Sequence, residues 1–193
     1  MAKHKYFIYG SGGHATSLIG NLLFEGCNIQ GVVDEHSELT NLFHLPISTS
    51  LPDNLMGGQF LVAIGDNFIR NKVMTKIIDQ YGEDSLGTFI SSKSYVSKGV
   101  TVGAGAVVMP RSYLGPKSEL SMGVLINTGA IVEHDCFLSI SSSLAPNSVL
   151  AGLVKLGSFT HIGLSSTVDA KVTLGSNCVL GANSFLMENL GDN

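Results

Sequence analysis

One histidine of this chain stands between two acidic residues, in the segment Glu133-His134-Asp135. An unperturbed imidazole titrates at about pH 6.5, so it can accept a proton at neutral pH. An adjacent carboxylate can orient the ring and stabilise its protonated form. The segment therefore has the residue types of a general base. On spacing alone, an exposed turn histidine without a chemical role is an equal alternative.

A glycine-rich turn near the N-terminus has the residue types that hold phosphate. The segment Gly10-Ser11-Gly12-Gly13-His14 follows a short apolar run and precedes a helical stretch. The N–H groups of such a turn, together with the N-terminus of the helix, can bind a phosphate. The segment fits the dinucleotide-binding pattern G-x-G-x-x-G loosely, because Ala15 occupies the place of the third glycine.

Two further loops place polar residues at the ends of apolar runs. Asp34 closes the run after the first helical stretch, where an acid can contact a ribose or a base. A solvated turn acid is the alternative for Asp34. Gly65 and Asn67 follow the next run, and Arg70 lies just beyond them at the start of a helical stretch. Arg70 can reach a phosphate from there, or it can remain a surface charge.

Every sixth residue from 96 to 186 is leucine, isoleucine or valine, and this repeat predicts the element that positions His134. A period of six fits neither a helix nor a simple strand, and it is typical of a parallel β-helix built from hexapeptides. The residue four places after each aliphatic residue is small or of modest size. The repeated residues are Val96, Val102, Val108, Leu114, Leu120, Ile126, Val132, Leu138, Leu144, Leu150, Leu156, Ile162, Val168, Leu174, Leu180 and Leu186.

Three hexads make one triangular turn of such a coil, so residues eighteen apart stack on rungs about 4.8 Å apart. His134 then projects from a corner, because Val132 and Cys136 occupy the inward positions. Gly152 lies directly above His134, and its N–H can hydrogen-bond a developing oxyanion. This geometry is what acyl transfer requires. Asn127, in the preceding turn, is an ordinary turn residue or a contact for a substrate amine or hydroxyl.

The first part of the chain lacks the hexad register and alternates strand-like with helix-like stretches. The predicted strands are 6–9, 29–33, 59–64 and 86–90, and the predicted helices are 15–25 and 68–81. This alternation favours a small parallel sheet of Rossmann type. We therefore predict an α/β Rossmann-like domain at 1–92 followed by an all-β parallel β-helix at 93–193, joined near 91–94.

Composition and charge exclude several classes of protein. The formal net charge is −4, so no basic surface predicts a nucleic-acid partner. No apolar stretch is long enough for a transmembrane helix, and residues 1–10 have too short an apolar run for a signal peptide. Cys27, Cys136 and Cys178 lack metal-type spacing, so no metal site is predicted. Cys136 and Cys178 fall on inward positions and are interpreted as core thiols of a cytoplasmic protein.

Four segments together resemble one family. They are Tyr-Gly-Ser-Gly-Gly-His-Ala at 9–15, Val-Val-Asp at 32–34, Ala-Ile-Gly-Asp-Asn-Phe-Ile-Arg at 63–70 and Asn-Thr-Gly-Ala-Ile-Val-Glu-His-Asp-Cys at 127–136. These segments resemble bacterial hexapeptide-repeat sugar acetyltransferases, which include UDP-4-amino-sugar N-acetyltransferases and sialic acid O-acetyltransferases. The resemblance implies a left-handed coil, a homotrimer, and acetyl-CoA in a groove between two coils.

The resemblance also implies roles for single residues. His134 matches the general base, Asp135 its supporting acid, and Gly152 the N–H donor to the thioester oxygen. Asn127 matches a residue near the sugar amine. Positions expected at the coenzyme are Leu164, Ala182 and Ser143, the last standing where many relatives carry a second histidine. The nucleotide-sugar pocket is expected at Gly10, Ser11, His14, Asp34, Gly65, Asn67 and Arg70.

These observations lead to one main hypothesis and two alternatives. The main hypothesis is an acetyl-CoA-dependent N-acetyltransferase that acts on a nucleotide-linked amino sugar of the UDP-4-amino-sugar type, for bacterial surface glycans. O-Acetylation of a sialic-acid-like sugar uses the same base and is the first alternative. The second alternative is a non-catalytic scaffold that binds a nucleotide sugar. Two features favour it: Ser143 stands in place of a histidine, and the sequence ends before a strand that touches the coenzyme in relatives.

Overall fold

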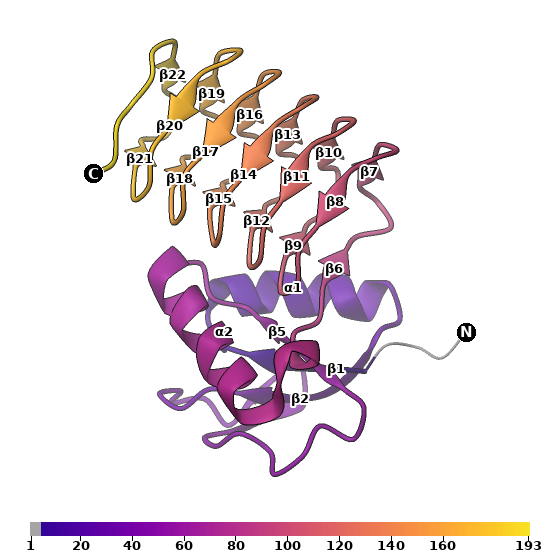
Figure 1. Cartoon of the computed structure of the whole chain (residues 1–193). Coiled ribbons are helices and arrows are strands. Elements are labelled where there is room, and N and C mark those ends of the chain that lie inside the picture. Colours follow the sequence, from indigo (N-terminus) through magenta and orange to yellow (C-terminus); the bar gives the residue numbers. More distant parts are fainter. Residues whose placement is uncertain (1–4) are drawn as a thin grey trace. The chain divides into compact units, whose positions relative to one another are not determined.

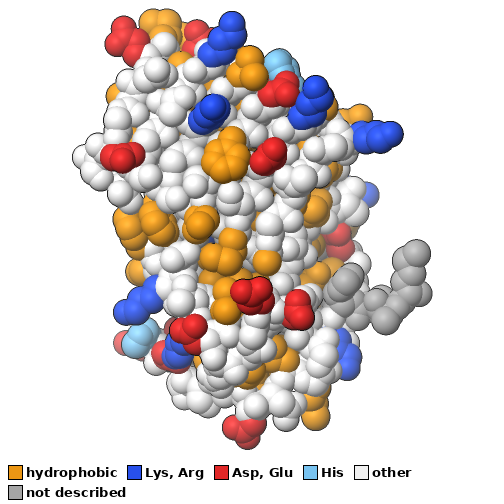
Figure 2. Space-filling model, in the orientation of Figure 1, with side chains coloured by type: hydrophobic (Ala, Val, Ile, Leu, Met, Phe, Trp, Pro, Cys, Tyr) orange, Lys and Arg blue, Asp and Glu red, His pale blue; other side chains and the backbone are white. Residues whose placement is uncertain are grey.

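A computed structural model describes residues 5–193, and they form two compact units (Figure 1). The first unit ends at Gly87 and the second runs from Thr88 to Asn193. Residues 1–4, which open the stretch in which no signal peptide was predicted, lie outside the described part. Within residues 5–193, no helix is long and apolar enough to cross a membrane. On the face drawn in Figure 2, acidic and basic side chains are scattered and form no single charged field.

The first unit is a five-stranded sheet with the order β3-β4-β2-β1-β5. Its parallel part consists of β4 (Leu45–Ser48), β2 (Asn28–Val33), β1 (Lys5–Tyr9) and β5 (Gln59–Val62), and β3 (Asn41–Leu42) pairs antiparallel with β4. The helices are α1 (Gly13–Phe24), α2 (Asn67–Tyr81) and the short 3-10 helix η1 (Glu83–Ser85). The predicted α/β class is therefore confirmed, while the hairpin β3–β4 was not predicted.

Helix α1 forms because its apolar residues recur on one side. Ala15, Leu18, Ile19 and Leu22 are completely buried, at the helical spacing of three or four residues. They pack with the sheet interior, where Ile8 and Leu61 are also completely buried. Full burial of each large aliphatic side chain contributes about 1.5–3 kcal/mol. This packing fixes where β1 ends and α1 begins, which positions the glycine-rich turn between them.

The second unit is a parallel β-helix whose strands coincide with the predicted hexads. Sixteen two-residue strands each end on one of the sixteen predicted aliphatic residues. They are β7 (Tyr95–Val96), β8 (Thr101–Val102), β9 (Val107–Val108), β10 (Tyr113–Leu114), β11 (Glu119–Leu120), β12 (Leu125–Ile126), β13 (Ile131–Val132), β14 (Phe137–Leu138), β15 (Ser143–Leu144), β16 (Val149–Leu150), β17 (Lys155–Leu156), β18 (His161–Ile162), β19 (Thr167–Val168), β20 (Thr173–Leu174), β21 (Val179–Leu180) and β22 (Phe185–Leu186).

Three sheets form the sides of the coil. Their orders are β22-β19-β16-β13-β10-β7, β20-β17-β14-β11-β8 and β21-β18-β15-β12-β9-β6. Paired residues are eighteen apart, as Tyr113 with Ile131 shows. The predicted stacking is thus confirmed, and Figure 1 shows the successive rungs. The second residue of each pair faces inward, so Leu114, Val132 and Leu150 are completely buried in one core.

The predicted strand at 86–90 divides between the two units. Leu86 forms a bridge with Phe60 of the first unit, whereas β6 (Phe89–Ile90) pairs with β9 in the coil. Ile90 continues the hexad register one step before Val96. The coil therefore begins before the junction predicted near 91–94, because β6 has a hydrogen-bonding partner on the next rung and none in the α/β sheet.

Each corner of the coil contains a residue with positive φ, three places after the inward aliphatic residue. Their φ values lie between 52° and 84°. The residues are Gly99, Gly105, Arg111, Lys117, Gly123, Gly129, Asp135, Ser141, Asn147, Leu153, Phe159, Ser165, Lys171, Asn177 and Asn183. This conformation suits Gly, Asn and Asp and is strained for bulkier residues. The stacked strands impose it on every rung, which makes the direction of each corner side chain predictable.

Candidate functional site

The corner at residues 133–136 holds His134 and Asp135 in contact. His134 Nδ1 lies 2.8 Å from Asp135 Oδ2, and the two side chains are 52 % and 39 % exposed. Asp135 has φ 56°, a conformation that aspartate tolerates better than most residues. Its carboxylate thus turns back toward the ring that precedes it. With Nδ1 held by a carboxylate, Nε2 is the nitrogen left to act as a base.

Ser118, one rung below, holds this corner at both ends. Its Oγ donates to the Glu133 carbonyl at 2.7 Å and accepts from the Cys136 N–H at 3.3 Å. Ser118 is completely buried, so these bonds have no competition from water. The Asp135 N–H donates to the carbonyl of Pro116 at 3.0 Å. The backbone that carries His134 is therefore fixed by the rung beneath it.

Gly152 lies directly above the imidazole. A Cβ built on Gly152 would meet His134 Nε2 at 2.5 Å, so a side chain at this position would displace the imidazole. The carbonyl of Ala151, just before it, accepts a bond from the Cys136 thiol at 3.2 Å. Among residues 5–193, no acceptor for the Gly152 N–H is present. The predicted stacking of Gly152 above His134 is thus present in the fold.

Cys136 and Cys178 are buried thiols, as predicted. Their exposed fractions are 1 % and 4 %, and burial raises the pKa of Cys136 to about 11. Each thiol donates to a carbonyl on the next rung, as Ser118 and Thr160 do from equivalent inward positions. The small inward residues of the repeat therefore satisfy turn carbonyls. This explains why serine, threonine and cysteine alternate with alanine and valine there.

The residues predicted to meet the coenzyme lie along another edge of the coil. Leu164 and Ala182 follow β18 and β21, whereas His134 follows β13 in a different sheet. Leu164 is half-exposed and Ala182 is exposed. Asn127 shares their edge, and its side chain donates to the Leu144 carbonyl at 2.9 Å. A single coil therefore does not bring Asn127 next to His134, because the side of the coil that contains β13 lies between the two corners.

Ser143 contacts a histidine of the neighbouring rung. Its Oγ lies 2.8 Å from His161 Nδ1, one rung above in the same ladder of β15 and β18. Ser143 itself is buried. A histidine is thus present one rung away from the position where many relatives carry one. The spacing of eighteen residues between Ser143 and His161 was the signal that could have revealed this pair.

A cavity of about 470 Å³ opens in the first unit at the carboxyl ends of β1, β2 and β5. Ligands of open α/β sheets bind at this edge, where the strand order reverses. The lining includes five of the predicted substrate-binding residues, namely Gly10, Ser11, His14, Asp34 and Gly65. Gly10 has φ 110°, and a Cβ there would meet the Ala63 carbonyl at 2.9 Å. Only glycine therefore fits between the ends of β1 and β5.

Asp34 is engaged by the glycine-rich turn. Its Oδ2 accepts from the Ser11 N–H at 2.9 Å and the Ser11 hydroxyl at 2.6 Å, and its Oδ1 accepts from the His36 N–H at 3.0 Å. Burial opposes ionisation of Asp34, but these bonds together lower its pKa. Asp34 thus ties the loop after β2 to the loop after β1, which shapes the wall of the cavity.

His14 places an unpaired nitrogen at the cavity. Its Nε2 is buried and has no hydrogen-bonding partner among residues 5–193. Burial, followed by the nearby charge of Arg70, lowers the pKa of His14 to about 4. The ring is therefore neutral at physiological pH. An unpaired buried nitrogen costs free energy that a bound ligand can recover.

Asn67 and Arg70 do not line this cavity. Arg70 is 1 % exposed, and its guanidinium donates to the carbonyls of Ile64 and Gly65 and, at 2.8 Å, to Asn67 Oδ1. The guanidinium thus holds the loop after β5, and the phosphate contact of Arg70 stays a prediction. Burial lowers the pKa of Arg70 to about 10, so it stays charged at neutral pH.

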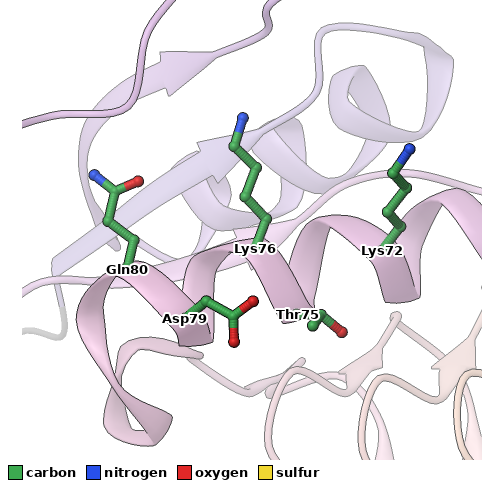
Figure 3. Close-up of a pocket in the computed structure, with 5 residues that line it drawn as sticks. All are labelled: Lys72, Thr75, Lys76, Asp79 and Gln80. Carbon is green, nitrogen blue, oxygen red and sulfur yellow. The ribbon is translucent and has the colours of Figure 1, made fainter.

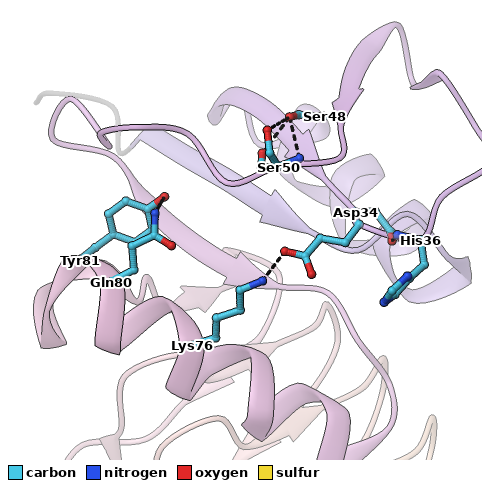
Figure 4. Close-up of polar contacts among 8 residues, drawn as sticks. Asp34, His36, Ser48, Ser50, Lys76, Gln80 and Tyr81 are labelled. Atoms are coloured by element: carbon cyan, nitrogen blue, oxygen red, sulfur yellow. Dashed lines mark hydrogen bonds and ion pairs between the residues drawn. The ribbon is translucent and has the colours of Figure 1, made fainter.

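Three cavity residues that sequence reasoning missed form a connected group. Tyr9 donates its hydroxyl to Glu35, and Glu35 forms an ion pair with Lys76 of α2. Figure 4 shows Lys76 extending from α2 toward the segment that contains Asp34 and His36. A second, flatter hollow of about 570 Å³ lies on α2 at Lys72, Thr75, Lys76, Asp79 and Gln80 (Figure 3). Lys72 and Lys76 thus contribute to both.

Comparison with known proteins places this geometry in a family. Residues 5–77 match the model of the PglD N-terminal domain. PerB from Caulobacter crescentus, solved with CoA and GDP-perosamine, is 32 % identical with a TM-score of 0.89, and the match covers 100 % of this chain and 93 % of PerB. This chain is a bacterial sugar acetyltransferase of the hexapeptide-repeat family.

Two further solved structures support the assignment to the sugar acetyltransferase family. A mutant of GDP-perosamine N-acetyltransferase from C. crescentus is 31 % identical, with a TM-score of 0.90 over 99 % of this chain and 92 % of that one. The acetyltransferase domain of PglB from Neisseria gonorrhoeae, with acetyl coenzyme A, is 25 % identical, with a TM-score of 0.89 over 99 % and 94 %. The fold agrees with the left-handed β-helix that the resemblance implied. Within residues 5–193, no group of metal-ligating side chains occurs.

Proposed function

We propose that this sugar acetyltransferase transfers an acetyl group from acetyl-CoA to the amine of a nucleotide-linked amino sugar. The observation that carries the proposal is the His134–Gly152 column, in which the imidazole occupies the space that a Cβ on Gly152 would need. The GDP-perosamine N-acetyltransferase at 31–32 % identity acts on an amino sugar, which favours N-acetylation over O-acetylation.

In the proposed reaction, the sugar amine attacks the thioester carbonyl carbon directly. His134 Nε2 accepts a proton from the amine as the C–N bond forms. The Gly152 N–H donates to the oxygen that becomes negative. The C–S bond then breaks. The sulfur of coenzyme A accepts a proton from the imidazolium, and coenzyme A leaves as the thiol. Asp135 holds the ring and stabilises its charged form, and no cysteine intermediate is required.

The cavity of the first unit is proposed to hold the nucleotide. Ser11, Gly12 and Gly13 lie at the N-terminus of α1, where N–H groups favour phosphate. We predicted a UDP-sugar from the sequence, whereas PerB was solved with a GDP-sugar. The sugar nucleotide is therefore proposed at the level of a nucleoside diphosphate, and we place the reaction in the cytoplasm, where nucleotide sugars and acetyl-CoA are made.

A homotrimer is part of the proposal, because one coil separates the base from the predicted coenzyme residues. His134 lies on one edge, and Leu164 and Ala182 lie on another. The outward face of the sheet beside His134 is apolar and includes Tyr95 and Phe185, which are 65 % and 59 % exposed. A second copy seated there would cover this face. Light scattering of the full chain should then give three times the mass of one chain.

Substitution of His134 tests the reaction directly. His134→Ala should lower kcat by at least about 100-fold, which is the usual scale of general base catalysis. His44→Asn is the matched control, since His44 is an exposed histidine outside both the coil and the cavity lining, and asparagine tolerates its positive φ. Acetylation is measured as thiol release from acetyl-CoA with GDP- and UDP-linked amino sugars. Near-normal turnover of the His134 variant would remove it from the mechanism, and a chain that ignores acetyl-CoA in calorimetry would be a binding scaffold.

A further inference from the structure

Glu35 is the acidic residue of the α/β cavity that is best placed to hydrogen-bond a ligand. Asp34 stands at the position where Rossmann-like folds present an acid to a nucleotide. Here both of its oxygens accept bonds from the protein itself, from Ser11 and the His36 N–H. Glu35 also lines the cavity, and its side chain is 31 % exposed. The acid that remains open to a ligand is therefore the neighbour of the expected one.

Glu35 and Lys76 present an acceptor beside a donor. A carboxylate has about four lone-pair sites, and the contacts with Tyr9 and Lys76 use two of them. The Lys76 ammonium has three N–H donors, and its bond to Glu35 uses one. Burial, and then Glu35, raises the pKa of Tyr9 to about 12, so its hydroxyl stays a donor that orients Glu35. The pair is thus held in place with unused capacity on both partners.

We propose that Glu35 and Lys76 recognise the edge of a nucleobase that carries a ring N–H beside an exocyclic carbonyl. Guanine and uracil both present this edge, with the N–H directed to the carboxylate and the carbonyl directed to the ammonium. The assignment builds on the proposed nucleotide-sugar function and names the part of the nucleotide that the cavity selects.

Other residues of the cavity fit this orientation. Ile69 and Val73 of α2 line the same cavity as Lys76 and offer apolar contact to a flat ring. The N-terminus of α1 at Gly12 and Gly13 lies in the same lining and suits the diphosphate. The volume of about 470 Å³ is within the range of small-molecule sites. Helix α2 therefore contacts the base, and the N-terminus of α1 binds the diphosphate.

With the ring nitrogen directed to Glu35 and the exocyclic group directed to Lys76, the same pair disfavours adenine and cytosine. At neutral pH their ring nitrogens on this edge are acceptors, which a carboxylate repels. This discrimination matters because the acetyl donor is itself an adenine nucleotide. A cavity that read phosphate and ribose alone would also admit acetyl-CoA. Glu35 thus keeps the two nucleotide-bearing substrates of the reaction apart.

Binding of four nucleoside diphosphates to the full chain tests the inference. GDP, UDP, ADP and CDP share the ribose and the diphosphate, so differences among them report on the base. By calorimetry, GDP or UDP should bind at least about tenfold more tightly than ADP and CDP, as expected for a hydrogen bond to a charged group. The GDP and UDP arms show which of the two bases is preferred.

Two variants separate base reading from a structural role. Glu35→Gln should weaken the preferred nucleotide by about 10-fold or more and improve ADP relative to it, because an amide can both donate to and accept from adenine. Lys76→Met should weaken GDP and UDP with a smaller effect on ADP. Glu38→Gln is the matched control, since Glu38 is an exposed acid of the same segment outside the cavity lining. Unchanged melting temperatures show that the variants fold.

The possible outcomes test base recognition separately from the proposed nucleotide-sugar function. Equal binding of all four nucleotides by the unmodified chain would overturn base reading and leave the nucleotide site in place. An equal loss of all four in Glu35→Gln would assign Glu35 to the ribose. Absence of binding by any nucleotide would contradict the proposed function itself. If Glu35→Gln unfolds, the selectivity of Lys76→Met decides.

Discussion

The corner of the coil at His134 and the cavity of the α/β unit build their sites in different ways. At the corner, each residue occupies a position that the repeat defines on every rung. Ser118, His134 and Gly152 differ from the residues at equivalent positions of other rungs only in their side chains. In the cavity, the loops after three strands meet, and hydrogen bonds within the protein occupy several of their polar groups. In a repeat, the neighbours of a site residue can therefore be predicted from the sequence spacing. Where loops converge, those neighbours are residues distant in sequence.

Gly152→Ala gives the largest expected effect, because a Cβ at that position would take the space that the His134 imidazole occupies. The added carbon would meet His134 Nε2 at 2.5 Å and displace the base from its donor. We expect kcat to fall on the order of 1000-fold, the combined scale of a lost base and a lost oxyanion donor. Gly31→Ala, where a Cβ has free space, is the control. Normal turnover of Gly152→Ala would show that the stacked column does not do the chemistry.

Arg70→Met tests whether the α/β loops depend on their own bonds. It leaves the carbonyls of Ile64 and Gly65 and the Asn67 amide without their donor. Each unpaired buried group costs about 1–3 kcal/mol, so the free energy of unfolding should fall by about 3 kcal/mol or more. Denaturation in urea measures this, with exposed Arg111→Met as the control. A stable variant that loses GDP or UDP binding would restore the phosphate contact predicted from the sequence.

The pH dependence of stability distinguishes the units, because the α/β cavity contains a buried neutral histidine. The folded pKa of His14 is about 4, below its unfolded value of about 6.5. The unfolded chain therefore binds the extra proton between these values, and stability falls as pH drops through that window. The loss can reach about 3 kcal/mol. His14→Gln should remove this slope, and urea midpoints from pH 7 to pH 4 measure it. An unchanged slope would mean that His14 is not buried neutral.

The two acids that flank His134 should not be equivalent. Asp135 contacts Nδ1, and Glu133 makes no contact of this kind. Asp135→Asn keeps a residue that tolerates positive φ but removes the charge, so kcat should fall about tenfold. Glu133→Gln should leave kcat within about twofold, because the charge removed lies away from Nδ1. Steady-state assays compare the pair, and equal losses would show that the general negative charge of the segment is what matters.

Cys136→Ser should have the smallest effect. Serine occupies the equivalent inward slot at Ser118 and makes the same type of bond to the next rung. Because the thiol is buried and its pKa is about 11, it is not a nucleophile at neutral pH. We expect kcat within about threefold of the unmodified chain, measured as thiol release from acetyl-CoA. Loss of activity as large as that of His134→Ala would contradict direct transfer.

The hexad period predicted the coil and the stacking of its corner residues. The period of six gave the inward aliphatic residues, the small slots, and the placement of Gly152 above His134, all of which the structure contains. It did not reveal the corner residues with positive φ, because residues as different as Gly99, Leu153 and Lys171 occupy that slot. Strand stacking imposes the conformation there, so local residue preference carries little signal.

Packing between distant segments, which the sequence does not reveal, determines which polar residues of the α/β unit can meet a ligand. Asp34 and Arg70 stand at positions that suggest ligand contacts, yet Ser11, His36 and the loop after β5 take up their hydrogen-bonding groups. Glu35 and Lys76 are 41 residues apart and become partners only when β2 and α2 pack in one unit. The physical reason is that a hydrogen-bonding group has few sites, and contacts between distant segments determine which of them remain.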